Sequence, residues 1–173
     1  MATYRRGFKK TTPEQMLLRV IVGIIAVVFV FVIAAYLYAS TYGSWEYENY
    51  THLTAYETLL TQEDENEDQL QDYVLYFYGS GCESCLDIKN KVMRYTDKIN
   101  SDSTMVYFVD IENMDDEDEY LDTFLDDISK STLTTPMLVV VANGDFYEWV
   151  SGTDDVVNLL KQIKDGEYEP FND

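Results

Sequence analysis

The chain has 173 residues, of which 46% are hydrophobic, and this is enough for one ordinary core and an additional apolar segment. Its formal net charge of −20 is divided unevenly, because residues 1–40 carry +4 and the remainder carries −24. The charge of the acidic part disfavours nucleic acid and anionic lipid headgroups as partners and favours basic ones.

Residues 20–39 contain no charged side chain and consist mainly of Val, Ile, Phe and Ala. A helix of this length is about 30 Å long, which is enough to cross a bilayer once. The basic residues before this run predict that the N-terminus lies in the cytoplasm. We therefore expect a cytoplasmic basic segment at 1–19, a transmembrane helix at 20–39 that acts as a signal-anchor in the cell membrane, and an extracytoplasmic domain after it. A cleaved signal peptide is the alternative, although its apolar region is usually about 7–15 residues long.

The remainder divides into a short polar and aromatic tether at 40–46, a folded domain at 47–166 and an acidic tail at 167–173. The domain holds the only histidine of the chain, His52. A single histidine without a second ligand or nucleophile beside it in the sequence carries little functional information, and we assign it no role.

The first part of the domain predicts one strand and one helix. Residues 47–53 have the composition of a short strand. The capping-box pattern from Thr54 to Glu57 predicts the start of a helix that continues through Leu60. The acidic run at 63–68 that follows is interpreted as solvated surface.

The most informative stretch combines a strand, a glycine-rich turn, a pair of cysteines and a helix. Residues 73–78 are rich in Tyr, Val and Phe and predict a buried strand, and Cys82 and Cys85 follow after the turn at 79–81. After Cys85 the apolar residues recur at helical spacing as far as Asn100. A thiol at a helix N-terminus faces free backbone N–H groups and the positive end of the helix dipole, which favour the thiolate. The two thiols can therefore cycle between a dithiol and a disulfide.

Two other interpretations of this cysteine pair remain open. The pair could form a structural disulfide, although so small a ring constrains little of the unfolded chain. A structural zinc site is disfavoured, because the sequence supplies only two cysteines and one histidine as ligands. The sequence contains no flavin or nicotinamide motif, and we expect neither a metal nor a cofactor.

A second buried strand at 105–109 and the preceding helix predict a right-handed βαβ unit with parallel strands. Within the acidic segment 110–127, apolar residues recur at helical spacing and predict a helix packed on the sheet. The same segment offers hard oxygen ligands for calcium, but the glycine and the spacing of an EF-hand are absent. The residues of this disfavoured calcium site are Asp110, Glu112, Asn113, Asp115 and Asp116.

The last part of the domain predicts a hairpin and a helix. Residues 137–141 form a Val-rich strand, and Asn143-Gly144 is a type I′ turn signal that returns the chain along a strand at 145–151. Thr153 or Asp154 is the predicted cap of a final amphipathic helix. The predicted order of elements is βαβαβαββα, an α/β fold.

These features together resemble a membrane-anchored member of the thioredoxin superfamily. The resemblance rests on the strand into Cys82-Glu83-Ser84-Cys85, on Thr135-Pro136 ahead of the Val-rich strand, on the hairpin and on the last helix. It implies a thioredoxin-like fold, a mixed sheet flanked by helices, in which Cys82 attacks a substrate disulfide and the more buried Cys85 resolves the mixed disulfide. It also implies that Thr135-Pro136 is a cis-proline turn whose backbone pairs with an extended substrate strand.

The chain departs from the family pattern between and before its cysteines. Glu83 and Ser84 lie between the pair and are the candidates for tuning its redox properties. Tyr76 stands where thioredoxins carry a buried acid, so no evident carboxylate can transfer protons to Cys85. The negative charge of Glu83 disfavours a thiolate at Cys82 and predicts a weaker oxidant.

The sequence therefore predicts a membrane-anchored, extracytoplasmic thiol–disulfide oxidoreductase of bacterial type that exchanges disulfides with protein substrates. A membrane redox partner is expected to supply or accept electrons. The main alternative is a non-catalytic thioredoxin-like module in a membrane or export complex, similar to the bacteriocin-transport accessory proteins. A cation-binding surface protein is a third and weaker hypothesis. The client protein, the direction of electron flow and the oligomeric state are not encoded in any motif of the chain.

Overall fold

The computed structural model divides into two compact units, residues 1–44 and 45–173, and each is described by itself. Some residues of the predicted N-terminal segment, the tether, the acidic runs and the tail lie outside the part that is described. The described residues are 13–42, 46–63, 69–100, 104–115 and 118–171.

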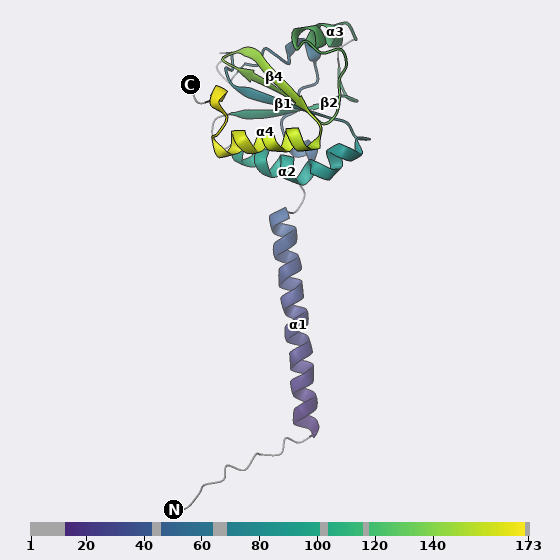
Figure 1. The fold of residues 1–173 in the computed structure, drawn as a ribbon. Coiled ribbons are helices and arrows are strands. Elements are labelled where there is room, and N and C mark those ends of the chain that lie inside the picture. The colour runs from purple at the N-terminus through teal and green to yellow at the C-terminus, as the bar shows by residue number, and fades with distance from the viewer. Residues whose placement is uncertain (1–12, 43–45, 64–68, 101–103, 116–117, 172–173) are drawn as a thin grey trace, which may run out of the picture. The chain divides into compact units, whose positions relative to one another are not determined.

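The first unit contains one long helix, α1, from Pro13 to Tyr42 (Figure 1). Its residues Pro13–Tyr38 have a mean hydropathy of 3.1, and none of the most apolar stretch is buried within the chain. By length and composition this helix can cross a membrane, and a signal sequence near an N-terminus meets the same criteria. The helix extends beyond the predicted span at both ends, and Pro13 occupies a position in its first turn where a missing N–H costs nothing.

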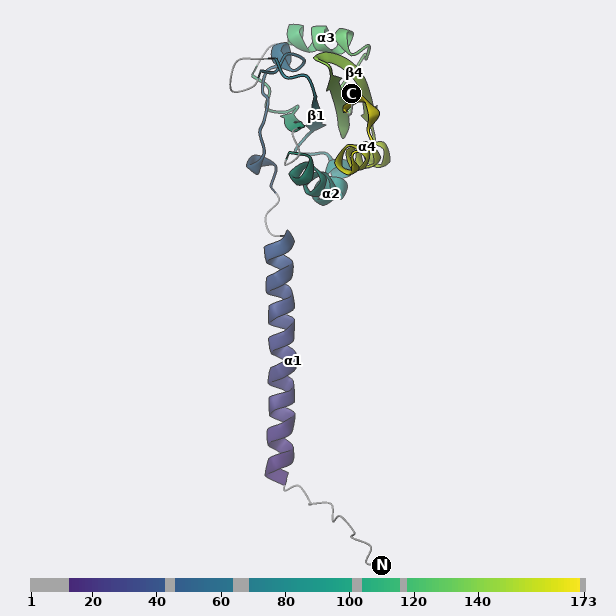
Figure 2. The same ribbon diagram turned by 90° about the vertical axis from the view of Figure 1, so that its left-hand side faces the viewer.

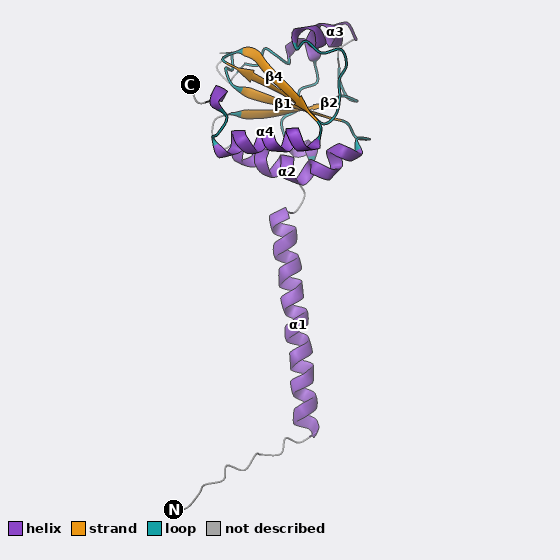
Figure 3. Cartoon of the chain, viewed as in Figure 1, coloured by secondary structure: helices purple, strands orange, loops and turns teal. Residues whose placement is uncertain are grey.

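The second unit is built on a mixed sheet of four strands in the order β2-β1-β3-β4 (Figure 3). Its central strand β1, Tyr73–Tyr78, pairs in parallel with β2, Met105–Asp110. On its other side β1 pairs antiparallel with β3, Met137–Ala142, which in turn pairs antiparallel with β4, Asp145–Ser151. The predicted α/β class and the four strands from residue 73 onward are confirmed.

Three helices cover the two faces of this sheet. Helices α2, Glu83–Ile99, and α4, Thr153–Asp165, pack against each other on one face, and α3, Asp118–Asp127, lies on the other (Figures 1 and 2). Successive side chains of a strand point to opposite faces, so β1 contributes to both layers of the core. Val74, Tyr76 and Tyr78 lie in the layer beneath α2 and α4, whereas the intervening residues of β1 lie in the layer beneath α3.

The hairpin between β3 and β4 turns as its sequence predicts. Asn143 and Gly144 have φ values of 55° and 80°, which are the positive values that a type I′ turn requires. The predicted cap of the last helix is wrong, because Gly152 is the N-cap of α4 and makes no side-chain cap bond. Gly152 has a φ of 94°, a backbone conformation that side chains other than glycine rarely adopt.

The first strand and helix of the predicted order are wrong within the described residues. Tyr47–Asn49 form a 3-10 turn, and only His52 bridges the sheet, opposite Phe108 of β2. The predicted helix after Thr54 is a single 3-10 turn, Tyr56–Thr58, without a side-chain cap. The buried rings of Tyr47 and Tyr56 explain both differences, because anchoring each ring in the core overrides the local pattern.

The segment predicted as an acidic tail is part of the folded unit. Tyr168 is buried, and its hydroxyl donates a hydrogen bond of 2.6 Å to Oε1 of Glu148 on β4. A 3-10 turn at Glu169–Phe171 follows, and the ring of Phe171 packs against Tyr168. The domain therefore extends to Phe171, because these two rings add to the core layer beneath α2 and α4.

Candidate redox site

The two cysteines lie at the start of α2, directly after the turn that follows β1, as the sequence predicts. Cys82 is the N-cap of α2, and Cys85 is in the first turn of that helix. The two sulfur atoms form a disulfide of 2.10 Å, with a Cα–Cα distance of 5.2 Å. Cys82 is half-buried, whereas Cys85 is completely buried in the core. Only the first cysteine is therefore accessible to a protein substrate.

The surroundings of Cys82 supply hydrogen-bond donors to its sulfur. The backbone N–H of Cys85 donates to Sγ of Cys82 at 3.1 Å, so this sulfur caps the helix. Oγ of Ser84 lies 3.3 Å from the same sulfur. Donors of this kind, together with the helix dipole, stabilise a negative charge on Sγ when the disulfide is reduced. A thiolate at Cys82 in the reduced form stays a prediction.

Ser84 also connects the cysteine pair to the loop before β3. Its hydroxyl donates a hydrogen bond of 3.5 Å to the carbonyl oxygen of Thr135. The Thr135–Pro136 peptide bond is cis, as the resemblance implies. The predicted substrate-binding residues therefore lie beside the predicted redox pair, although Thr135 is 51 positions after Ser84 in the sequence.

Glu83, the second tuning candidate, is exposed in the first turn of α2. A carboxylate in this position interacts favourably with the helix dipole. It also adds negative charge next to Cys82 in the sequence, which opposes a thiolate there. The effect of Glu83 on the redox pair stays a prediction.

Glu46, at the end of the predicted tether, and Tyr47 contact the helix that carries Cys85, and no pattern in the sequence indicated these contacts. The hydroxyl of Tyr47 donates to the carbonyl oxygen of Cys85 at 3.4 Å, and its ring stacks on Tyr78 with centroids 4.0 Å apart. Nζ of Lys89 on α2 lies 4.8 Å from the Tyr47 ring and forms a 2.6 Å salt bridge with Glu46. No sequence signal identifies Tyr47, because its partner is 38 residues away.

Tyr76 lies in the same core layer as Cys85 and is completely buried, as predicted. Burial raises the pKa of Tyr76 above its usual range, and the neighbouring phenol of Tyr47 raises it further. The phenol of Tyr76 therefore stays protonated at neutral pH. It can donate a hydrogen bond but cannot accept a proton from the Cys85 thiol as a carboxylate would.

Glu112, in the turn after β2, was considered only as a calcium ligand, and sequence reasoning missed its contact with the turn before Cys82. Its carboxylate accepts hydrogen bonds from the hydroxyl of Ser80 and, at 3.4 Å, from the backbone N–H of Gly81. Glu112 thus fixes the turn that leads into Cys82. The parallel pairing of β1 and β2 was the available signal, because the carboxyl ends of parallel strands meet at one edge of a sheet.

The disfavoured calcium site has no support among the described residues. No group of three or more His, Cys, Asp or Glu side chains is arranged there to hold a metal ion. The Asp110 carboxylate instead accepts from the backbone N–H of Glu112 and from Nδ2 of Asn113. Asp116 lies outside the described residues.

Comparisons with known proteins give matches among solved structures. No protein-family model and no curated protein matches the chain. The oxidised mitochondrial thioredoxin 3 of Saccharomyces cerevisiae is 18% identical over 69% of this chain and 97% of its own, with a TM-score of 0.49. Thioredoxin O2 of Arabidopsis thaliana is 20% identical over 72% of this chain and 99% of its own, with a TM-score of 0.47. Thioredoxin of Trypanosoma brucei brucei is 15% identical over 70% and 93%, with a TM-score of 0.48.

We base the fold assignment on features that this chain itself shows. The sheet order β2-β1-β3-β4, the disulfide at the N-terminus of α2 and the cis-proline before β3 occur together in one domain. A mixed sheet, a cysteine pair at the start of a helix and a cis-proline turn are the features that the sequence resemblance implies, and the strand order comes from the structure. The domain from residue 45 onward therefore has a thioredoxin-like fold with a CxxC disulfide.

Proposed function

We propose that this protein is a membrane-anchored thiol–disulfide oxidoreductase that exchanges disulfides with protein substrates through Cys82 and Cys85. The observation that carries the proposal is the asymmetry of the pair at the N-terminus of α2. Cys82 is accessible and surrounded by donors, and Cys85 is buried within bonding distance of it.

The reaction proceeds in two exchange steps. The Cys82 thiolate attacks a substrate disulfide, breaks its S–S bond and forms a mixed disulfide, and one substrate sulfur leaves as a thiolate. The Cys85 thiolate then attacks the Cys82 sulfur, which restores the Cys82–Cys85 disulfide and releases the second substrate thiolate. Two electrons pass from the pair to the substrate in this direction. The same steps in reverse oxidise a substrate dithiol.

The loop before β3 is the proposed binding surface for the substrate chain. Thr135 precedes the cis-proline Pro136 and is linked through Ser84 to Cys82. An extended substrate segment can pair with the backbone of Thr135, as peptides pair with exposed strand edges in other recognition modes. Ser84 then lies between the substrate-binding loop and the reacting sulfur.

Membrane anchoring by α1 explains the apolar surface of this helix. The helix has many exposed large apolar side chains, and a contiguous apolar surface of this size needs a cover other than water. A bilayer is a cover of matching thickness. The positive charge of the segment before the helix supports a cytoplasmic N-terminus and a domain outside the cytoplasm, where disulfides persist.

The second candidate function is a non-catalytic thioredoxin-like module in a membrane or export complex. Tyr76 favours it, because a buried neutral phenol gives the Cys85 thiol no base for its deprotonation. In this case the disulfide would be structural. A function that survives in a double variant, Cys82→Ser with Cys85→Ser, would support this candidate.

The deciding measurement is the reduction potential of the pair in the full chain, held in detergent micelles and equilibrated with glutathione or dithiothreitol before thiol trapping. We expect a potential between about −270 and −120 mV, the range of known exchange proteins. A potential below about −300 mV would indicate a structural disulfide and overturn the proposal.

Single-cysteine variants give an independent check on the order of attack. Cys85→Ser should accumulate a mixed disulfide between Cys82 and a peptide disulfide, because nothing resolves it. Cys82→Ser should form little adduct, because Cys85 is completely buried. Equal adduct formation by both variants would contradict the assigned roles.

A further inference from the structure

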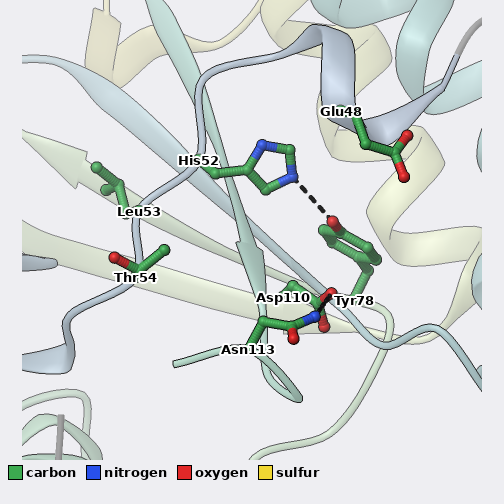
Figure 4. Close-up of a pocket in the computed structure, with 7 residues that line it drawn as sticks. All are labelled: Glu48, His52, Leu53, Thr54, Tyr78, Asp110 and Asn113. Carbon is green, nitrogen blue, oxygen red and sulfur yellow. Dashed lines mark hydrogen bonds between the residues drawn. The ribbon is translucent and has the colours of Figure 1, made fainter. Parts of the chain in front are cut away.

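A pocket of about 380 Å³ lies at the carboxyl ends of β1 and β2 (Figure 4). Tyr78 and Asp110, the last residues of these strands, line it together with Asn113 of the turn after β2. Glu48 and His52, from the segment before the sheet, line its other side. Its volume lies within the range of small-molecule sites, and the ends of parallel strands are a common place for ligands.

The hydrogen bonds of His52 determine which groups it leaves for a ligand. Nδ1 lies 2.9 Å from the carbonyl oxygen of Tyr50, which can only accept, so Nδ1 carries the proton of the neutral ring. Nε2 then accepts the hydroxyl proton of Tyr78, at 2.8 Å (Figure 4). The N–H of His52 and the O–H of Tyr78 therefore both donate within the protein, and the Tyr78 oxygen retains lone pairs that can accept a hydrogen bond from a ligand.

The turn after β2 uses its donors in the same way. Nδ2 of Asn113 donates to Oδ2 of Asp110 at 2.7 Å, and the backbone N–H of Glu112 donates to Oδ1 at 3.1 Å. These bonds orient the Asp110 carboxylate and leave the amide oxygen of Asn113 as an acceptor. Apart from the hydroxyl of Thr54 and the second N–H of the Asn113 amide, the polar side-chain groups that line the pocket are left as acceptors.

The electrostatic potential of the pocket is negative. Burial raises the pKa of Tyr78, and the negative charges of Asp110 and Glu48 raise it further. Among the described residues that line the pocket, none is Lys or Arg. A surface of acceptors with net negative charge is complementary to a cation with several N–H donors, which describes an ammonium or a guanidinium group.

The pocket and the redox pair flank the same turn. The backbone N–H of Ile111 donates to the carbonyl oxygen of Tyr78 at 3.0 Å, and Glu112 accepts from Ser80 and Gly81, which precede Cys82. Cys82 follows Tyr78 by four positions, so the Cα atoms of the two residues are at most about 14 Å apart. An extended substrate segment of about four residues covers this distance.

We propose that the pocket binds the ammonium or guanidinium group of a Lys or Arg side chain that lies within about four residues of the reactive cysteine in the substrate. This assignment deepens the proposed exchange function and rests on it. It makes a protein substrate with a basic residue near its disulfide the preferred client. Glu48 and the Tyr78 oxygen are the binding groups, and the Asp110 carboxylate supplies further negative charge.

The first test measures binding without any redox step. His52 is the only histidine, so ring-labelled histidine in the full chain, held in nanodiscs, reports on this pocket alone by NMR. Titration with n-butylguanidinium should shift the His52 ring signals saturably, and n-butanol should not. Glu48→Gln should weaken binding about threefold, and added salt should weaken it in the parent chain.

The matched control is Glu167→Gln, which removes the same charge at an exposed position after α4. It should bind n-butylguanidinium as the parent chain does. An absence of saturable shifts, or equal weakening by both variants, would overturn the assignment of the pocket.

The second test measures exchange with two peptide disulfides that differ only in one residue, Lys or norleucine, three positions from the cysteine. We expect kcat/KM to be about threefold higher for the Lys peptide, and Glu48→Gln should abolish this preference. Equal exchange with both peptides would refute the substrate preference but leave the oxidoreductase function intact. Exchange with neither peptide, despite binding of n-butylguanidinium, would refute the oxidoreductase function and the substrate assignment, and leave only a cation-binding pocket.

Discussion

The two cysteines of the pair lie only three positions apart, and their surroundings are of opposite kinds. Cys82 lies at a helix end, where the N–H of Cys85 donates to its sulfur and the hydroxyl of Ser84 lies 3.3 Å away. Cys85 lies in a core layer of aromatic and aliphatic side chains. The outer sulfur is placed among donors that stabilise charge, whereas the inner sulfur is placed where charge is penalised.

This difference separates two kinds of control over the pair. Local residues between the cysteines can change the charge state of Cys82 with little effect on the fold. Residues around Cys85, such as Tyr47 and Tyr76, are part of the core, so changes there act on stability first. Variants and pH can test the two surroundings separately.

Alkaline pH should have the largest effect, because it acts on the aromatic layer around Cys85 as a whole. Burial raises the pKa of Tyr47, Tyr76 and Tyr78 above the ordinary value of 10.0. Above this pH the unfolded chain loses phenol protons that the folded chain retains, so stability falls as pH rises. Each such group contributes a slope of about 1.4 kcal/mol per pH unit.

We expect cooperative unfolding above about pH 10, followed by circular dichroism after a pH jump, with phenolate absorbance rising in the same transition. Full stability should be present below this pH. Gradual ionisation of all tyrosines without loss of the fold would show that water reaches the layer around Cys85.

Tyr76→Asp should have the next largest effect. It puts a carboxylate at a completely buried position in the layer around Cys85, and a buried charge without a partner is costly. We expect the free energy of unfolding to fall by about 3 kcal/mol or more, measured by urea unfolding of the full chain in detergent. Tyr76→Phe is the control and should cost about 1 kcal/mol or less, because it retains the ring. Similar losses in the two variants would mean that the carboxylate finds a partner or water inside this layer.

The contrast between local groups and core packing also explains which parts of the structure were predictable from the sequence. The strand into Cys82, helix α2 and the hairpin at Asn143 and Gly144 are encoded by local periodicity and turn residues, and their bounds agree with the structure. The pattern at Thr54 is equally local and failed, because the buried ring of Tyr56 holds that segment in a single 3-10 turn.

The residues of the site were likewise predictable only where they belong to a local motif or to the family resemblance. Cys82, Ser84 and Cys85 follow from one short motif, and the position of Thr135 follows from the family resemblance. The contacts of Tyr47 with Cys85 and of Glu112 with Gly81 join segments 38 and 31 residues apart. Contacts of this range depend on tertiary packing, so periodicity does not encode them, and the predicted parallel pairing of β1 and β2 indicated only the edge of the sheet at which Glu112 lies.

The smallest effects are expected at the two residues between the cysteines, and they should have opposite signs. In the disulfide form the hydroxyl of Ser84 donates to the carbonyl oxygen of Thr135, and in the reduced form it can turn to the Cys82 thiolate. Ser84→Ala removes this donor and should raise the pKa of the Cys82 thiol by about 0.7, which corresponds to one hydrogen bond of about 1 kcal/mol.

Glu83→Gln removes a negative charge next to Cys82 and should lower the pKa of its thiol by about 0.3, because the carboxylate is exposed and screened by solvent. A more stable thiolate favours the reduced form, so the reduction potential should rise by about 10 mV at most. Thiol alkylation rates across pH measure the pKa of Cys82, and the glutathione equilibrium measures the potential. The charge of Glu83 opposes the Cys82 thiolate, but it also stabilises the N-terminus of α2. If the pKa of Cys82 changed in the same direction in both variants, the stability of this helix, rather than the local electric field at Cys82, would control the pair.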